Sequence, residues 1–321
     1  MKLVRTFNVG ALRCHTLEGG LQRLDGGAMF GVVPRPLWER AIAPDERHRI
    51  PLAMRCLLVE HPDGLVLIDT ALGGKEDAKF KDIYGIENES RGVSHRTPEG
   101  GTGTETSGAS TLTQLDDALE AAGFTAADIR WVINTHLHFD HAGGNTRREP
   151  AEVGHDEGAL RVAFPNATYV VQRGELEFAR NTNERTRASY LPPNFEPVAA
   201  AGKFKLLNGD AQVLPGIRVR LTPGHVPHHQ AVLVEDGGET TAFIADLIPT
   251  SAHLRLPWIM GYDLEPLRTL ESKRAILRDA ANEGWRLVFE HDAFVAWGTV
   301  VRTGTSVGLE GVEQLGSASA P

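Results

Sequence analysis

The stretch NTHLHFDHAGG at residues 134–144 constrains the fold most, because three histidines and one aspartate occupy six consecutive positions, 136–141. It follows the apolar run at 131–134, which is typical of a buried strand. Residues two apart on an extended chain point the same way, so His136 and His138 can converge on one cation, while Asp140 and His141 face a neighbouring position. Imidazole nitrogen and carboxylate oxygen are ordinary Zn²⁺ ligands. The stretch predicts a metal site at a strand end.

Three more candidate ligands stand at the ends of other apolar runs. His225 occurs in LTPGHVPHH after a Pro-Gly turn, Asp246 in FIADLIP and His291 in LVFEHDAF. Open α/β sheets gather their ligand-binding groups at strand ends. Any one of the three could be an ordinary turn residue. Together with the first stretch they indicate a single site that takes more than one ion.

The remaining pattern is that of an α/β protein. Helical spacing of apolar residues at 111–122 and 264–282 predicts two helices that pack on a sheet, the second with Asp263 as its N-cap. Short β-type runs, several of them apolar throughout as in a sheet covered on both faces, predict strands at 56–60, 65–69, 131–134, 168–172, 217–221, 231–235 and 241–245.

Two segments lack the apolar side chains that a folded element needs. Residues 91–110 and 303–321 are rich in small and polar residues and cannot offset their own ordering entropy. We expect a flexible loop at 91–110 inside one domain that spans residues 1–302, followed by a disordered tail over 303–321.

The charge balance argues against a nucleic-acid partner. Lys and Arg total 33 against 42 Asp and Glu, a formal net charge of −9, which leaves no basic excess to neutralise phosphates. The sequence has neither the apolar run of a signal peptide nor the ~20 apolar residues of a membrane helix, so we expect a cytoplasmic protein that binds no membrane. Cys14 and Cys56 are the only cysteines and are predicted to be buried free thiols.

The order HxHxDH followed by His, Asp and His resembles the metallo-β-lactamase superfamily, and matching motifs run from LIDT at residues 67–70 to His291. The resemblance implies a four-layer αββα sandwich with a dinuclear site in its edge. It also implies that Asp69 holds the ligand loop by hydrogen bonds. The ligand set that it implies is His136, His138 and His225 on one metal and Asp140, His141 and His291 on the other, with Asp246 bridging the two.

The resemblance also implies the chemistry. Two divalent ions ~3.5–4 Å apart lower the pKa of a shared water, and the resulting hydroxide attacks a carbonyl or phosphoryl group. Zn²⁺ is the first expectation, with Co²⁺, Mn²⁺ and Fe²⁺ open. Asp140 and Asp246 are the predicted catalytic carboxylates, and Asp140 is the better placed to pass a proton to the leaving group. The spacing TPGH…AD…EHD is similar to that of N-acyl-homoserine-lactone lactonases and methyl-parathion-type phosphotriesterases.

The chain departs from those lactonases three residues after Asp246, where Pro249 stands in place of their usual Tyr. Another group must then orient the carbonyl, and Tyr190, Tyr262 and His253 are candidates. Of the two histidines after His225, His229 is expected to be structural, while His228 could face the pocket. The apolar segments 28–38 and 254–262 could wall a hydrophobic pocket, form a dimer contact or simply pack in the core.

The predicted function is that of a dinuclear hydrolase acting on a small carboxylic ester, lactone or phosphotriester with an apolar portion. A nucleic-acid phosphodiesterase or a mononuclear iron dioxygenase on the same fold are the alternatives. A glutathione-thioester hydrolase is disfavoured because little chain follows His291. A non-catalytic scaffold would have little reason to keep two open metal positions. A homodimer is favoured only by analogy with the family.

Overall fold

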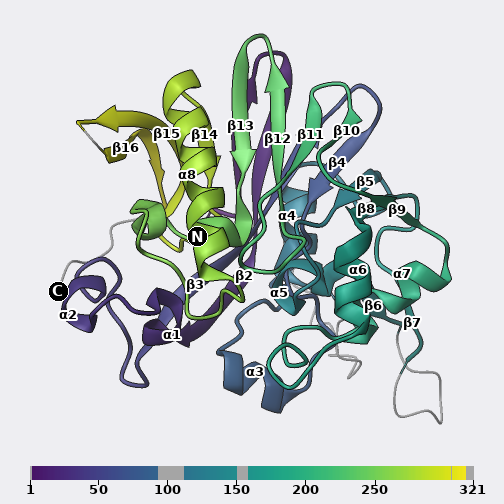
Figure 1. Cartoon of the computed structure of the whole chain (residues 1–321). Helices are drawn as coiled ribbons and strands as arrows, with labels where there is room; N and C mark the ends of the chain where they lie inside the picture. Colours follow the sequence, from purple (N-terminus) through teal and green to yellow (C-terminus); the bar gives the residue numbers. More distant parts are fainter. Residues whose placement is uncertain (1, 93–111, 150–157, 305, 316–321) are drawn as a thin grey trace, which may run out of the picture.

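Two large β-sheets face each other in the computed structural model (Figure 1), which describes residues 2–92, 112–149, 158–304 and 306–315. Within these residues each sheet has seven strands. The first sheet contains, in spatial order, β1 (Val4–Val9), β2 (Leu12–Asp25), β3 (Arg49–Glu60), β4 (Leu65–Ile68), β5 (Ile129–Ile133), β8 (Thr168–Gln172) and β9 (Phe204–Leu207). The second contains β10 (Ala211–Leu214), β11 (Ile217–Leu221), β12 (Gln230–Asp236), β13 (Glu239–Phe243), β14 (Arg286–Val288), β15 (Val295–Thr303) and β16 (Ser306–Gln314).

Most helices are short. The α-helices are α1 (Gly26–Phe30), α2 (Arg35–Trp38), α3 (Ala78–Tyr84), α4 (Gln114–Ala121), α5 (Phe139–Ala142), α6 (Arg173–Arg180), α7 (Glu196–Ala200) and α8 (Pro266–Glu283). The 3₁₀ turns are η1 (Gly143–Asn145), η2 (Pro192–Asn194), η3 (Ala245–Leu247) and η4 (Ser251–Leu254), and β6 (Thr146–Arg148) pairs with β7 (Leu160–Val162). None of the helices in the described part of the chain has the length and apolar character needed to span a bilayer.

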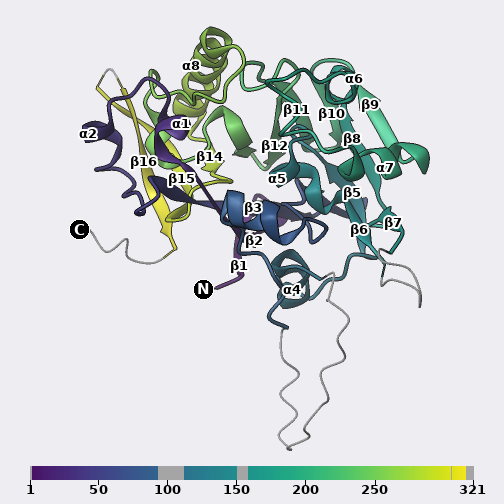
Figure 2. The same ribbon diagram turned by 90° about the horizontal axis from the view of Figure 1, so that it is seen from below.

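The elements form four layers. Apolar side chains of both sheets, such as Val59 from β3 and Phe243 from β13, meet in one buried cluster between the sheets. On the outer face of the first sheet, α4 packs through Leu115 and Leu119, and on the outer face of the second, α8 packs through Ile276. Figure 2 shows α4 and α8 on opposite outer sides of the sheets. This arrangement confirms the predicted αββα sandwich.

All seven predicted strands are present. Each predicted range lies within one observed strand or extends at most two residues beyond it. The observed strands are β3, β4, β5, β8, β11, β12 and β13. The long strand β2 was not predicted, because its sequence LRCHTLEGGLQRLD has no apolar alternation and contains two adjacent glycines. Its central part is nevertheless buried, since β2 lies between β1 and β3 under α4.

The prediction of a disordered tail from residue 303 is wrong for residues 306–315. Residues 306–314 form β16, which pairs antiparallel with β15. The apolar side chains of Val307, Leu309 and Val312 are partly buried against the cluster under α8, and a long partner strand supplies the backbone hydrogen bonds. Residues 316–321, and residues 93–110 of the predicted loop, lie outside the described residues.

The helix expected at 264–282 begins two residues later than predicted. Pro266 occupies the first turn of α8 and Glu265 is its N-cap, in line with the preference of proline for the first helical position. Asp263, the predicted N-cap, instead accepts a hydrogen bond from His225. A residue assigned to helix capping therefore belongs to the candidate site described below.

Both cysteines are buried free thiols, as predicted. Burial raises the pKa of Cys14 to about 12 and that of Cys56 well above its usual value, so neither forms appreciable thiolate near pH 8. We expect a maleimide or disulfide reagent at pH 8 to label neither thiol in the folded protein within minutes, and to label both after addition of denaturant. Stoichiometric labelling of either cysteine without denaturant would contradict the burial.

Candidate metal centre

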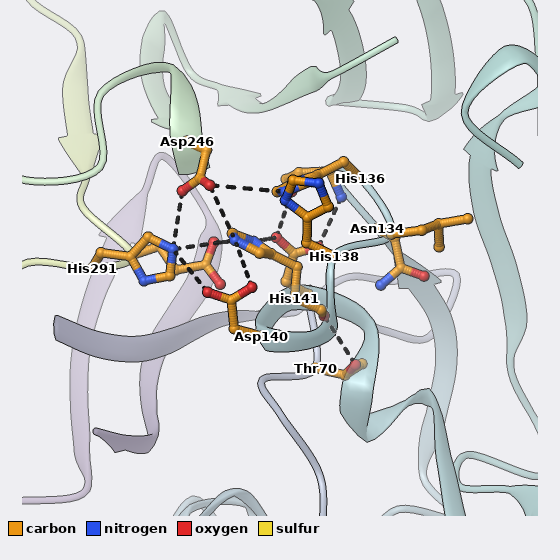
Figure 3. A network of polar contacts seen from close by, with 12 residues as sticks. Thr70, Asn134, His136, His138, Asp140, His141, Asp246 and His291 are labelled. Atoms are coloured by element: carbon orange, nitrogen blue, oxygen red, sulfur yellow. Dashed lines mark hydrogen bonds and ion pairs between the residues drawn. The ribbon is translucent and has the colours of Figure 1, made fainter. Parts of the chain in front are cut away.

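The ligand-rich stretch lies directly after β5, as its sequence predicts. His136 and His138 precede α5, and Asp140 and His141 lie within its single turn. Figure 3 shows these side chains converging with Asp246, from η3, and His291, which follows β14. His225, from the loop between β11 and β12, completes the set, so the seven predicted side chains are brought together from four segments of the chain.

The first group contains His136, His138, His225 and Asp246, whose potential ligand atoms all lie within 4.8 Å of one another. The Nε2 atom of His225 lies 3.1 Å from Nδ1 of His138 and 2.9 Å from Oδ2 of Asp246. Nε2 of His136 is buried and has no hydrogen-bond partner. These atoms enclose one position that a cation could occupy.

The second group contains Asp140, His141 and His291. The Nε2 atoms of His141 and His291 lie 3.1 Å apart, close to the ~3.3 Å expected for two nitrogens bound to one tetrahedral Zn²⁺ at ~2.0–2.1 Å. Asp246 directs Oδ1 toward Nε2 of His291, at 3.0 Å, while its Oδ2 faces the first group. The carboxylate of Asp246 therefore stands between two potential cation positions.

Hydrogen bonds on the far side of three imidazoles fix which nitrogen faces the centre. Nδ1 of His225 lies 2.9 Å from Asp263 Oδ1, Nδ1 of His291 lies 2.7 Å from the carbonyl oxygen of Ala53, and Nδ1 of His141 lies 3.1 Å from Asp69 Oδ2. Oxygen acceptors at these positions place a proton on each Nδ1. Each Nε2 then points inward, where a proton or a metal ion must balance the buried carboxylates. The residues present fit a pair of divalent cations.

Asp69 supports the ligand loop, as predicted. It accepts hydrogen bonds from the backbone N–H of Thr135, at 2.7 Å, and from the Thr135 hydroxyl, at 2.6 Å. Its Oδ2 also faces Nδ1 of His141. Such contacts orient metal-binding imidazoles and raise their basicity.

Gly143 and Gly144 permit a close approach of two backbones. Neither has a positive φ. A Cβ atom at Gly143 would lie 1.8 Å from the carbonyl oxygen of Leu72, and one at Gly144 would lie 2.1 Å from that of Thr70. Thr70 N–H in turn donates to the carbonyl of His141, so these contacts hold the end of the ligand loop against the segment that follows β4 and carries Asp69.

The carboxylates decide the protonation of the metal-free centre. Burial opposes the charged form of His225 and His291, but Asp246 outweighs it and raises the pKa of His225 to about 10 and that of His291 to about 9. Burial and the neighbouring imidazoles keep the pKa values of His136 and His138 well below normal. Near pH 7 the metal-free centre therefore holds protons on His225 and His291, the two imidazoles that face Asp246.

Metal binding should release protons, because Nε2 of His225 and of His291 must be deprotonated to bind a cation. Below pH 9 both imidazoles are protonated in the metal-free protein, so acidification weakens metal binding and a rise in pH toward 9–10 strengthens it. We expect at least two protons to be released per chain when Zn²⁺ is added to chelator-treated protein at pH 7.5 in weak buffer with an indicator dye. Metal uptake without acidification would contradict this assignment.

A cavity of about 690 Å³ opens onto the centre. At its polar end lie His138, Asp140, His225, Asp246 and His291. Its wall is mainly apolar and includes Leu24, Met29, Val32, Leu52, Met260 and Leu264. A substrate bound there would meet the candidate cations at one end and hydrocarbon at the other.

The apolar segments 28–38 and 254–262 serve both as cavity wall and as core. Met29, Val32 and Met260 line the cavity. Phe30 and Trp258 instead pack edge-to-face, with ring centroids 5.5 Å apart, in a separate buried cluster. Two of the alternatives that the sequence left open, the pocket wall and the packed core, are therefore both present.

Of the three groups proposed to orient a carbonyl, only Tyr262 lines the cavity. The hydroxyl of Tyr190 donates to Glu175, at 2.8 Å, and both ring nitrogens of His253 are engaged, with Thr250 and with the carbonyl of Met29. A further phenol on the cavity wall, that of Tyr84, was not predicted, because nothing in the surrounding sequence marks it.

The two histidines that follow His225 also differ in place. His229 is buried with its Nδ1 2.7 Å from the Thr222 hydroxyl, in keeping with the structural role expected. The imidazole of His228 lies against Gly174 at the start of α6 and does not line the cavity. The suggestion that His228 faces the pocket is therefore wrong.

Two buried polar residues beside the centre were missed in the sequence. Gln22, on β2, donates from Nε2 to Asp140 Oδ2. Glu290 places Oε2 3.0 Å from Nδ1 of His141. An acid at the end of the apolar run LVF, next to His291, was a signal for Glu290, whereas Gln22 lies in a strand that the sequence pattern does not show.

Comparison with known proteins identifies the family. The sequence model of the Metallo-beta-lactamase superfamily matches residues 51–291, a span that begins in β3 and ends on the last candidate ligand. The chain belongs to the metallo-β-lactamase superfamily. The family assignment inferred from the order of the ligands is thereby confirmed.

Individual relatives give more detail. An N-acyl homoserine lactonase from a Bacillus species is 32% identical over 189 residues, which cover 58% of this chain and 60% of that protein. The match thus spans less than two thirds of the relative's length. Among solved structures, a probable metal-dependent hydrolase from Staphylococcus aureus is 26% identical with a TM-score of 0.78, over 95% of this chain and 99% of the other. AidC, a dizinc quorum-quenching lactonase, is 20% identical with a TM-score of 0.71, over 96% of both chains, and shares the fold.

Proposed function

We propose that this chain is a metal-dependent hydrolase that opens the ring of a lactone with an apolar substituent, using two divalent cations. The observation that carries the proposal is the placement of Asp246 between two groups of inward-facing ligands, with Oδ2 2.9 Å from His225 and Oδ1 3.0 Å from His291. The relative named an N-acyl homoserine lactonase supports the choice of substrate class. The apolar cavity wall supports the substituent.

Zn²⁺ is the proposed metal, because imidazole and carboxylate ligands suit it. His136, His138 and His225 would hold one ion, Asp140, His141 and His291 the other, and Asp246 both. When bound, the pair would supply a water of lowered pKa as nucleophile and polarise the scissile carbonyl. No serine or cysteine nucleophile is then required.

Asp140 would move the proton in this scheme. Its carboxylate lines the cavity and belongs to the second group, with Oδ1 3.8 Å from Nε2 of His141. From that position it can carry a proton from the attacking water to the leaving ring oxygen. The hydrogen bond from Gln22 holds Asp140 Oδ2 and leaves Oδ1 free to take part.

Tyr262 is the proposed partner of the carbonyl oxygen in place of the tyrosine that Pro249 replaces. Burial and nearby Asp25 raise the pKa of Tyr262 to about 12, so its phenol stays a donor. We expect Tyr262→Phe to lower kcat about tenfold or more with a smaller effect on KM, as loss of one donor to a developing oxyanion does. Tyr84→Phe is the matched control, since the Tyr84 ring also lines the cavity but packs on Phe139. Equal losses in both variants would remove Tyr262 from this role.

A substrate panel tests the proposed function. Protein loaded with Zn²⁺ is assayed on γ-lactones with and without acylamino substituents, aryl esters, a phosphotriester and single-stranded RNA, and oxygen uptake is followed in iron-loaded protein. The proposal predicts the highest kcat/KM on the lactones. Preferred turnover of the phosphotriester would assign the site to phosphoryl transfer, and cleavage of RNA or uptake of oxygen would restore the alternatives derived from the sequence.

A further inference from the structure

The cavity that opens onto the metal centre carries one uncompensated positive charge on its wall. Among the described residues that line the cavity, Arg185 is the only lysine or arginine. It is exposed, whereas the ligands Asp246 and His291 are buried, so Arg185 lies at the solvent-facing rim of the cavity. No carboxylate in the described part of the chain pairs with its guanidinium group, which instead contacts a backbone carbonyl.

Hydrogen bonds hold Arg185 at its backbone and at the end of its side chain. Its N–H donates to Oδ1 of Asn183, at 3.0 Å, and the same oxygen accepts from the N–H of Thr186, at 3.2 Å. Nη2 of Arg185 donates to the carbonyl oxygen of Gly261, at 3.1 Å, and Gly261 N–H donates to the carbonyl of Ala28. The guanidinium group is therefore anchored to the part of the cavity wall that Ala28 and Gly261 form.

This anchoring leaves most donors of Arg185 free. A guanidinium group has five N–H donors in one plane, and the hydrogen bond to Gly261 uses one of them. Its two pairs of parallel N–H groups share Nη2, so occupation of one Nη2 hydrogen leaves one pair complete. Such a pair matches the two oxygens of a carboxylate. Arg185 is thus an accessible and positioned binding group for an anion.

We propose that Arg185 is a specificity-determining residue, which binds a carboxylate at the far end of the apolar substituent of the lactone. This inference rests on the proposed lactone hydrolysis. With the lactone ring at the buried centre, the substituent extends along the apolar wall, past Met29 and Met260, to the rim. The substrate class is then a lactone whose hydrocarbon chain ends in a carboxylate rather than in a methyl group.

The charge of the chain sets the size of the expected effect. The formal net charge is −9, so an anion approaching most of the surface is repelled, and Arg185 supplies a local attraction at the cavity rim. Because this guanidinium is exposed, its pair with a carboxylate is weaker than a buried pair and is screened by salt. We therefore expect a preference of several-fold at low ionic strength.

Two lactones that differ in one terminal group test the proposal. Both are γ-butyrolactones with the same alkyl chain, which ends in a carboxylate in the first and in a primary amide in the second. The amide has nearly the shape of the carboxylate without its charge, and both groups are remote from the ring. For Zn²⁺-loaded wild-type protein, the carboxylate-to-amide ratio of kcat/KM should be about fivefold at low salt. Arg185→Gln should bring this ratio close to one.

Arg187→Gln is the matched control. Arg187 lies two residues further along the same exposed turn, carries the same charge and does not line the cavity. The Arg187→Gln variant should keep the wild-type ratio. A disturbance of Tyr262, which follows Gly261, would lower both kcat/KM values by the same factor, so the ratio separates charge selection from positioning. Mass spectrometry should find the wild-type metal content in both variants.

The outcomes are distinct. A wild-type ratio near one, an unchanged ratio in Arg185→Gln or an equal fall in Arg187→Gln would overturn the role of Arg185 while the proposed hydrolysis stands. If wild-type protein opens neither lactone, the proposed function fails, and calorimetry with the two corresponding γ-lactams then decides on Arg185. Tighter binding of the carboxylate lactam to wild-type protein, lost in Arg185→Gln alone, would support the charge selection, and equal binding of the two lactams would overturn it.

Discussion

Asp246→Asn should lower kcat/KM by about a thousandfold or more and reduce the metal bound per chain. One carboxylate oxygen of Asp246 faces His225 of the first ligand group and the other faces His291 of the second. In the asparagine variant one of these oxygens becomes an amide nitrogen, which cannot bind a cation. Loss of a bridging anion also leaves two cations with less charge between them. Kinetics on a γ-lactone and metal analysis after gel filtration would measure both effects.

Asp279→Asn is the matched control for the Asp246 variant. Asp279 lies on α8 and forms a salt bridge with Arg220, 2.7 Å long, away from the cavity. The Asp279→Asn variant should retain wild-type metal content and turnover. A folded Asp246→Asn protein that binds two ions and keeps full activity would contradict the bridging role, and thermal unfolding of both variants would show that the fold is intact.

Glu18→Gln should lower the free energy of unfolding by about 3–5 kcal/mol, the usual result of removing one partner of a buried ion pair. Glu18 and Arg55 are both fully buried, and their two contacts, at 2.8 and 3.1 Å, form a bidentate pair. Arg5 also approaches Glu18, at 3.6 Å. The substitution would therefore leave the buried guanidinium group of Arg55 without its carboxylate, whereas Arg5 keeps Glu313 at 3.2 Å.

The same substitution should weaken the metal centre, because Arg55 also donates to the carbonyl oxygens of Phe289 and Asp292 on either side of His291. Urea unfolding of metal-loaded protein would measure the loss. Glu196→Gln is the control, since the Arg180–Glu196 pair is also bidentate but exposed, and exposed pairs contribute ~0–1 kcal/mol. Equal stability of the Glu18 and Glu196 variants would refute this account of the buried pair.

The candidate ligands could be predicted from the sequence because each follows a short apolar strand, and the ends of such strands meet at one edge of the sandwich. The residues behind the ligands could not. In the sequence, Asp263 looked like an N-cap. Only the folded chain shows that the helix starts at Pro266 and that Asp263 accepts a hydrogen bond from His225. Such contacts join residues distant in sequence and leave no local spacing to detect.

The burial of residues on the first sheet could not be predicted from the sequence either. The strand β2 carries polar residues and glycines, and it is buried by its neighbours rather than by its own apolar pattern, so Gln22 and Glu18 both escaped attention. Strand β16 was missed for a similar reason. Its small and polar residues suggest disorder, yet pairing with β15 satisfies its backbone and places a few apolar side chains against the core.

The most direct test of the central claim is anomalous X-ray diffraction at the zinc edge from crystals of Zn²⁺-loaded protein. The account predicts two peaks ~3.5–4 Å apart, one beside His136, His138 and His225 and the other beside Asp140, His141 and His291, with Asp246 between them. A single peak, or zinc bound away from these side chains, would contradict it.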